Sequence, residues 1–490
     1  RDDVESRGLG DVYKRQINNV LYMTLVIVSI LIIGYVLIST GWMTNVNRAA
    51  VAVFMGTVGW VLYICYGTDF VLAQHPREYS DFLMGVAPNP ENVKHFISQN
   101  IFLDYVGRGA EIALFLLATM SIVEILNNNG CFDFLTELLY TRSSKKMLWL
   151  ISIVTFVISA NLDNLTTTTM MLVIIHKILA NRRQRMLYGS AVIIAANCGG
   201  ALTVIGDPTG LVLWNIGAVD ASDFSMYLAL PCLVSMALPV WWLGRQLPER
   251  VETQGFAIPY RGDDTNLNRW QRMLMLFLGI GGLWFIPTFH NITKLSPFLG
   301  ALCVLSLLWV VNEIFNRRLM DVDKMIQRRI PRVLQYGVIQ MVLFVLGIMF
   351  AVGVVVETGA VSTLAQWIDD NVHNVWILGI VSGFFGSVLD TFATSMSFVS
   401  LHPVVDVANL GLWADSDYVG DFVRNGVYWK IIAYCSAMGG NMLLIGSVSG
   451  LALMKMERIR LGWYLRNVGW ICFVAWLIGL AIMWGTTFIY

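Results

Sequence analysis

Apolar runs of about 20 residues recur from one end of this sequence to the other. About 20 helical residues cross the hydrocarbon core of a bilayer. Each crossing segment must satisfy its own backbone hydrogen bonds, so only helices and closed barrels span membranes. The runs lack the short alternating pattern of barrel strands, and of the 490 residues 56% are hydrophobic and only 13% charged. We therefore predict an all-α polytopic protein embedded in a lipid bilayer, with no nucleic-acid partner.

Ten of these runs are long enough to be read as full spans by the hydropathy rule. Two further apolar stretches, 147–176 and 374–403, are each interrupted by an aspartate and a polar cluster. The ten predicted spans are 19–40, 48–66, 110–127, 186–214, 224–244, 272–289, 297–314, 333–356, 429–454 and 465–488.

The charges of the connecting segments predict how the chain is oriented in the membrane. Basic connections lie at 142–146, 177–185, 317–332 and 455–460, and acidic or mixed ones at 69–91, 220–223, 369–370 and 406–421. Basic connections face the cytoplasm under the positive-inside rule, which suits a bacterial inner (cytoplasmic) membrane. Both ends of 147–176 are then cytoplasmic and both ends of 374–403 external. Each of these stretches must enter and turn back, so we predict two re-entrant hairpins that open to opposite faces.

The two halves of the chain also share motifs. SANLDNLTTTTMM (159–171) parallels GSVLDTFATSMSF (386–398), and GGALTVIGDPTGLVL (199–213) parallels GGNMLLIGSVSGLAL (439–453). We predict an inverted-topology repeat, an architecture that places the substrate at the repeat interface near the membrane midplane. The predicted organisation is a non-native tail at 1–16, a first repeat at 17–247, a cytoplasmic linker at 248–271 and a second repeat at 272–490. Hairpin 147–176 and broken helix 186–214 belong to the first repeat, and hairpin 374–403 and broken helix 429–454 to the second.

Three aspartates fall at membrane depth: Asp163, Asp207 and Asp390. An ionised carboxylate at the bilayer centre costs roughly 2.5 to 3.5 kcal/mol on insertion scales, so each needs a cation, a proton or a hydrogen-bond donor. No Lys or Arg lies in the four motifs, which disfavours an anionic substrate. A hard cation prefers oxygen ligands. We expect sodium to bind through Asp163 and Asp390, with Asp207 as a further ligand or proton relay.

Oxygen-bearing side chains surround these aspartates. The glycine pairs and the IGDPTG and IGSVSG segments should break their helices and free backbone carbonyls for the ion. Burial disfavours the charged carboxylate, so one site can hold a proton or sodium but not both, and such competition produces exchange. The candidate oxygen ligands are Asn161, Asn164, Thr166, Thr167, Thr168, Asn197, Thr209, Thr391, Thr394, Ser395, Asn441 and Ser449, and the structural glycines are Gly199, Gly200, Gly206, Gly439, Gly440 and Gly446.

Structural explanations compete with these roles. An intramembrane aspartate can cap a half-helix, and Asp207 precedes a proline as a turn residue would. A threonine can bond back to its own helix. Glu124 and Glu357 end equivalent spans and can anchor at the interface, and the histidines that close the hairpins, His176 and His402, can do the same.

The motifs SANLDNLTTTT, AANCGGALTVIGDPTG and LDTFATS resemble those of the NhaD-type sodium/proton antiporters, in the ion transporter superfamily that also holds dicarboxylate and arsenite carriers. The resemblance covers nearly the whole chain after residue 16. It implies exchange of cytoplasmic Na+ or Li+ for external H+, often in a homodimer. The functional residues that it implies are Asp163, Asn164, Asn197, Asp207, Thr209, Asp390 and Ser436. The sequence contains no cofactor motif.

The sequence departs from the family pattern at two positions: Thr391 follows the second aspartate where Asn is common, and Gly210 stands where a second Thr is common. Three other classes of protein compete with the antiporter. A sodium-coupled symporter of a small organic anion is the main alternative, and an arsenite-type carrier is the second. An intramembrane aspartyl protease is disfavoured because Thr203 to Asp207 lacks the first glycine of GxGD.

Overall fold

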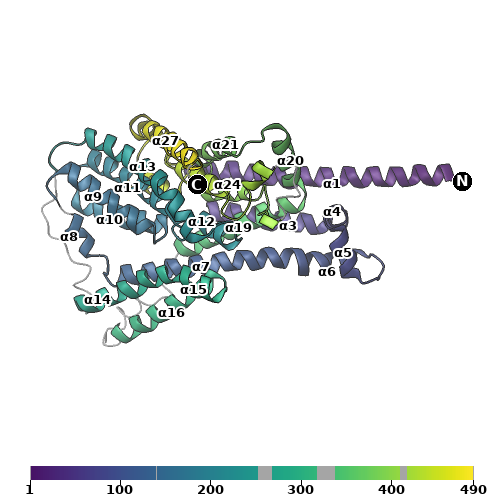
Figure 1. The fold of residues 1–490 in the computed structure, drawn as a ribbon, viewed down its shortest axis with the longest axis horizontal. Helices are drawn as coiled ribbons and strands as arrows, with labels where there is room; N and C mark the ends of the chain where they lie inside the picture. The colour runs from purple at the N-terminus through teal and green to yellow at the C-terminus, as the bar shows by residue number, and fades with distance from the viewer. Residues whose placement is uncertain (1, 140, 252–266, 317–336, 409–415, 489–490) are drawn as a thin grey trace. The chain divides into compact units, whose positions relative to one another are not determined.

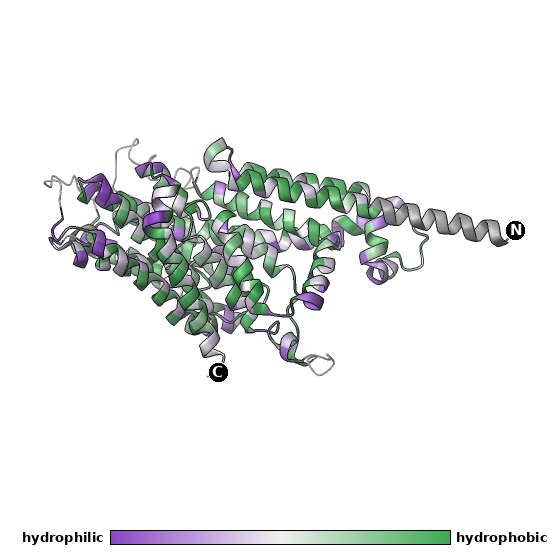
Figure 2. Cartoon of the chain, turned by 90° about the horizontal axis from the view of Figure 1, so that it is seen from above, coloured by the Kyte–Doolittle hydropathy of each residue, from purple (hydrophilic) through white to green (hydrophobic). Residues whose placement is uncertain are grey.

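The computed structural model describes residues 2–139, 141–251, 267–316, 337–408 and 416–488. Within these ranges every regular element is a helix, and only isolated bridges join Ser143 to Arg250 and Val405 to Val423 (Figure 1). Hydrophobic residues cover most of the helices, and hydrophilic ones gather at their ends and connections (Figure 2). The predicted all-α polytopic membrane fold is confirmed in these ranges.

Eight helices in the described part of the chain are long and apolar enough to cross a membrane. They match eight of the ten predicted spans and run over Val20–Ser39, Arg48–Cys65, Pro90–Asn128, Ala221–Gln246, Arg269–Thr293, Pro297–Asn316, Val338–Glu357 and Leu461–Thr486.

The other two predicted spans, 186–214 and 429–454, are not continuous helices. Each divides into two shorter helices at its glycine-containing motif. The helix that contains the predicted span 110–127 is longer than predicted and runs over Pro90–Asn128. Asn89 caps the helix start by accepting from the Glu91 amide, and π-helical turns at Ile97–Phe102 carry the helix on to Asn128. A π turn keeps the backbone hydrogen-bonded, so the polar residues there do not end the helix.

The chain folds into two compact units that do not follow chain order. Unit 1 contains residues 1–113, 341–373 and 396–403, and unit 2 contains 114–340, 374–395 and 404–490. Both predicted repeats contribute segments to each unit. The predicted linker 248–271 and the basic connection 317–332 fall largely outside the described residues.

Among the described residues, unit 1 contains all or part of four membrane-length apolar helices, together with shorter helices. Aromatic side chains fill its core, where Trp60 packs edge-on against Tyr63 and Phe102, and Tyr63 stacks on Phe70. The elements are α1 (Asp2–Ser39), α2 (Gly41–Thr44), α3 (Arg48–Cys65), α4 (Gly67–Gln74), α5 (Pro76–Leu83), α6 (Pro90–Phe96), η1 (Ile97–Phe102), the first part of α7 (Leu103–Asn128), most of α19 (Gly337–Glu357), α20 (Ala360–Asn371) and the end of α22 (Thr391–Val399).

Unit 2 is organised around α11 (Arg182–Leu202), whose side chains are buried over nearly its whole length. It packs against α9 (Ser144–Ser159), α10 (Asn164–Ile178), α13 (Ala221–Gln246), α24 (Val427–Gly439) and α25 (Val448–Glu457). The other described elements of unit 2 are the end of α7, α8 (Phe134–Leu139), α12 (Pro208–Asn215), α14 (Arg269–Leu276), η2 (Phe277–Gly281), α15 (Gly282–Thr293), α16 (Pro297–Asn316), the start of α19, α21 (Val375–Val388), the start of α22, α23 (Ser416–Gly420), α26 (Leu461–Tyr464), η4 (Leu465–Gly469) and α27 (Trp470–Thr486).

Candidate functional site

Asp163 lies in the turn between α9 and α10 and caps α10. Its Oδ2 accepts from the backbone amide of Thr166 at 2.9 Å and from the Thr166 hydroxyl at 3.1 Å. One carboxylate oxygen is therefore used as an ordinary N-cap. The other, Oδ1, is buried and has no hydrogen-bond partner among the described residues. The cap therefore uses only one of the two oxygens of this carboxylate.

Asp390 occupies the matching turn between α21 and α22. Its Oδ1 accepts from the Phe392 amide at 3.0 Å. The next residue, Thr391, donates its backbone N–H to the carbonyl of Gly446 at 3.1 Å. The start of α22 is therefore bonded directly to the second helix break.

Both long motif helices are interrupted where the glycine motifs predict freed carbonyls. α11 ends at Leu202 and α12 begins at Pro208, with Asp207 in the N-cap position. α24 ends at Gly439 and α25 begins at Val448, where Ser447 accepts from the Gly450 amide at 2.9 Å. Pro208 suits the first helical position because its missing N–H would have no partner there.

Backbone approaches at the breaks leave no room for a side chain. A methyl group on Gly206 would lie 2.7 Å from the Ser159 carbonyl oxygen at the end of α9. On Gly446 it would collide with the Gly386 carbonyl near the end of α21. Ser159 and Gly386 are aligned positions in the two motif sequences, so each break packs against its hairpin motif in the same way.

The three predicted aspartates come together in unit 2. Asp163 and Asp207 are each 6% exposed and Asp390 is 2% exposed. Asp207 interacts electrostatically with both of the other carboxylates. Three acids from three different elements therefore share one buried region.

Hydroxyl and amide bonds join motifs from both predicted repeats. Thr209 donates to Ser395 Oγ at 3.1 Å, and Ser395 Oγ lies 2.6 Å from Ser436 Oγ. Asn197 Nδ2 donates to Asn441 Oδ1 at 2.8 Å. These five side chains are all buried, so the predicted polar residues form interior contacts between segments far apart in sequence.

Several buried oxygens in the motifs lack a hydrogen-bond partner among the described residues. Such groups are rare in folded proteins and each calls for an explanation, such as an unseen water or ion. Besides Asp163 Oδ1 they are Thr167 Oγ1, Thr168 Oγ1, Asn197 Oδ1, Thr394 Oγ1 and Ser449 Oγ. In the described ranges no group of three or more His, Cys, Asp or Glu could hold a metal ion, so a cation here would depend on hydroxyl, amide and carbonyl oxygens as well as carboxylate.

The sequence prediction missed two residues that hold the first hairpin motif in place. Thr203 donates its hydroxyl to the Ala160 carbonyl and accepts from the Gly206 amide at 3.1 Å. Ser159 donates to the Ala196 carbonyl at 2.7 Å. Hydroxyl residues beside a helix end could have signalled these bonds. Asn164, in contrast, packs near Gly200, and its side chain has no hydrogen bond among the described residues.

Comparison with known proteins gives the family. A family described as citrate transporter (CitMHS) matches residues 35–414, which is most of the chain. The chain belongs to this family. Several curated relatives of the chain bear names that agree with its motif resemblance.

Sodium/proton antiporter 1 of Arabidopsis thaliana is 32% identical over 380 residues, covering 76% of this chain and 61% of the relative. The chain therefore spans about three fifths of that protein's length. Sodium/proton antiporter 2 of the same plant is 28% identical over 76% of this chain and 84% of its own length. Na(+)/H(+) antiporter NhaD of Vibrio parahaemolyticus is 25% identical over 71% and 83%. The predicted NhaD-type resemblance is confirmed.

Proposed function

We propose that this protein exchanges cytoplasmic Na+ or Li+ for external H+. The observation that carries the proposal is the group of three buried aspartates in unit 2, surrounded by buried oxygens that lack partners in the described structure. Such a group needs positive charge, and the motifs supply none of their own. The antiporter names of the relatives support the same reading.

The exchange would follow from competition between sodium and protons for the same site. Asp163 and Asp390 would each be neutralised by either a proton or sodium, because a buried carboxylate is costly when charged and alone. Asp207, near both, would act as a further ligand or relay. The Thr209, Ser395 and Ser436 hydroxyls and the Asn197 and Asn441 amides would supply neutral oxygens or hold the ligands in position.

An inverted repeat would give this site its two access routes. The matched contacts of the two breaks with Ser159 and Gly386 support the repeat. So does the packing of the residues that follow the two aspartates, Asn164 and Thr391, near the second glycine of each pair. Re-entrant hairpins that open to opposite faces remain part of the proposal.

The test is sodium-induced proton release in everted membrane vesicles, followed with a pH-sensitive dye. Addition of Na+ or Li+ should dissipate the proton gradient in the wild type and fail to do so in Asp163→Asn and Asp390→Asn. Asp417→Asn, an exposed acid outside the motifs, is the matched control and should respond like the wild type. A wild type that is silent to both cations would overturn the proposal.

The description of the family as citrate transporter favours one second candidate, a sodium-coupled symporter of a small organic anion. A tricarboxylate needs cationic donors, and the four motifs contain no Lys or Arg. Uptake of labelled citrate in right-side-out vesicles, driven by an inward sodium gradient, distinguishes the two. Antiport predicts no uptake above vesicles that lack the protein.

A further inference from the structure

A second group of ionisable side chains lies in unit 1, apart from the motif residues. His75, in the turn between α4 and α5, places Nε2 at 2.8 Å from Glu357 Oε2 and Nδ1 at 2.9 Å from Glu78 Oε2. The Tyr105 hydroxyl on α7 donates to the other Glu357 oxygen, Oε1, at 2.8 Å. One imidazole thus joins the α4–α5 turn, the first turn of α5 and the end of α19.

The chemistry of this group depends on a proton. An ionised carboxylate only accepts hydrogen bonds, and a neutral imidazole has a single N–H donor. His75 can donate to both glutamates only as the imidazolium cation. The hydrogen bond with Glu357 accordingly raises the pKa of His75 above its ordinary value, although partial burial of the ring works in the opposite direction.

The neighbours of the bridge are all on unit 1 elements. Tyr63 on α3 interacts electrostatically with Glu357. Asp104 and Arg108 flank Tyr105 on α7 and pair with each other at 2.8 Å. From α6, Phe96 presents its ring edge-on at 6.4 Å from the imidazole centroid. The side chain of His75 is 22% exposed and that of Glu357 11%, whereas Glu78 is 70% exposed, so the Glu357 bond is the better shielded of the two.

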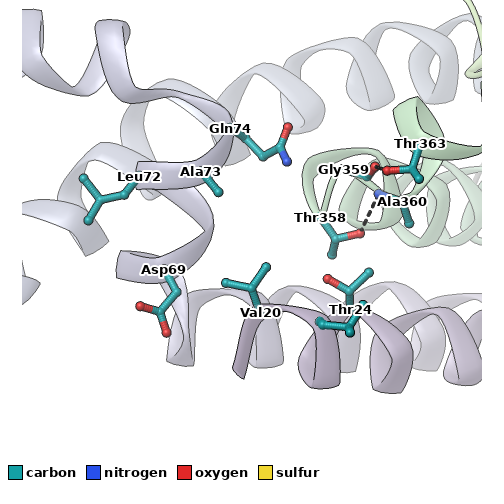
Figure 3. A pocket seen from close by; sticks show the side chains of 11 residues that line it. Val20, Thr24, Asp69, Leu72, Ala73, Gln74, Thr358, Gly359, Ala360 and Thr363 are labelled. Atoms are coloured by element: carbon teal, nitrogen blue, oxygen red, sulfur yellow. Dashed lines mark hydrogen bonds between the residues drawn. The ribbon is translucent and has the colours of Figure 1, made fainter. Parts of the chain in front are cut away.

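The bridge stands beside a cleft of about 500 Å³. Gln74, which precedes His75, lines one wall, and Thr358 and Gly359, which follow Glu357, line another (Figure 3). Val20 and Thr24 of α1 form the floor in this view. The His75–Glu357 bond therefore ties two walls of the cleft together.

We propose that His75 is a proton-dependent latch, whose imidazolium holds the α4–α6 segment (67–96) to the end of α19 and whose neutral form releases it and opens the cleft. Because the folded state raises the pKa of His75, the stabilisation is fully present below the pKa of a free imidazole. It is lost as pH rises through the higher value of the latched state. The latch does not depend on the proposed antiport.

Hydrogen exchange of the purified full-length chain in detergent tests the latch, after correction for the intrinsic pH dependence of exchange. Between pH 6 and pH 9, peptides from 67–96 in the wild type should lose protection roughly tenfold in a single step. His75→Gln should remove the step and leave the segment weakly protected at every pH. Glu78→Gln keeps the Glu357 bond but removes one raising partner, so the step should persist with its midpoint at a lower pH.

His95→Gln on α6 is the matched control, because His95 is an exposed histidine in the same segment, and its step should equal that of the wild type. A wild type without a step, or a His75→Gln variant that keeps one, overturns the proposal. If His75→Gln does not fold, the Glu78→Gln midpoint decides, and an unmoved midpoint overturns the latch. No transport is measured, so either result leaves the antiport proposal to its own test.

Discussion

At the scale of single residues, Asp163 combines two tasks that are usually alternatives. Its Oδ2 caps α10 through Thr166, while its Oδ1 is buried without a partner among the described residues. A cap needs only an acceptor oxygen, which asparagine also provides. A site for sodium or a proton needs the negative charge. Substitutions can therefore separate the two tasks.

We expect Asp163→Asn to keep the cap and change the free energy of unfolding by less than about 0.5 kcal/mol, whereas Asp163→Ala should cost about 1 kcal/mol. Neither variant should retain sodium-dependent proton release. Thermal unfolding in detergent, run beside the vesicle assay, measures both quantities. If Asp163→Asn transports normally, the carboxylate is a cap and nothing more.

At the scale of elements, the helix breaks depend on backbone contacts that only glycine permits. A methyl group at Gly206 would meet the Ser159 carbonyl at 2.7 Å, and one at Gly107 on α7 would meet nothing within 4 Å. Gly206→Ala should therefore destabilise the protein by about 1 to 3 kcal/mol through overpacking.

Gly107→Ala is the control and should stabilise the protein by about 0.5 to 1 kcal/mol, because alanine is the better residue inside a helix. Unfolding midpoints of the two variants in the same detergent measure the difference. Equal midpoints would show that the α9 contact tolerates a side chain.

A buried acid ties the end of α25 to α10 and α11. Glu457 is 6% exposed, and its Oε1 lies 2.9 Å from Arg185 Nε and 3.2 Å from His176 Nδ1. Arg182 donates to the Glu457 carbonyl at 2.8 Å. Since α10 carries Asp163 at its start and α25 follows the second break, this contact fixes two parts of the candidate site relative to each other.

Removing one partner of a buried ion pair leaves the other charge buried and unpaired, which lowers the free energy of unfolding by about 3 to 5 kcal/mol. Glu457→Gln should therefore lower the unfolding midpoint by several degrees. Glu249→Gln, at an exposed position of unit 2, should leave it unchanged. A Glu457→Gln midpoint equal to that of the control would contradict the structural role given to this pair.

At the scale of the whole molecule, a bound cation should stabilise the fold. Sodium at ten times its dissociation constant should add about 1.4 kcal/mol to the free energy of unfolding. The gain should shrink as pH falls, because protons compete for the same carboxylates. Thermal unfolding in NaCl against choline chloride measures it, and Asp390→Asn should reduce or abolish the gain. A wild type equally stable in both salts speaks against sodium binding.

The sequence alone determined the class of fold, because span length, hydropathy and the absence of barrel periodicity are local properties. It also placed the three aspartates, the glycine pairs and the helix breaks, since each is a short motif with its own backbone consequence. A hydropathy window counts 186–214 and 429–454 as two full spans because it averages over each break, and the breaks were predicted instead from the glycine motifs within them.

Only the tertiary structure decided which side chains meet. Thr209, Ser395 and Ser436 bond to one another from three separate elements, and Asn197 reaches Asn441 across 244 positions. The His75 bridge to Glu357 spans 282 positions, and the two compact units mix segments of both halves. Contacts of this kind leave no periodic mark in a sequence, because they are set by how whole helices pack and not by the order of neighbouring residues.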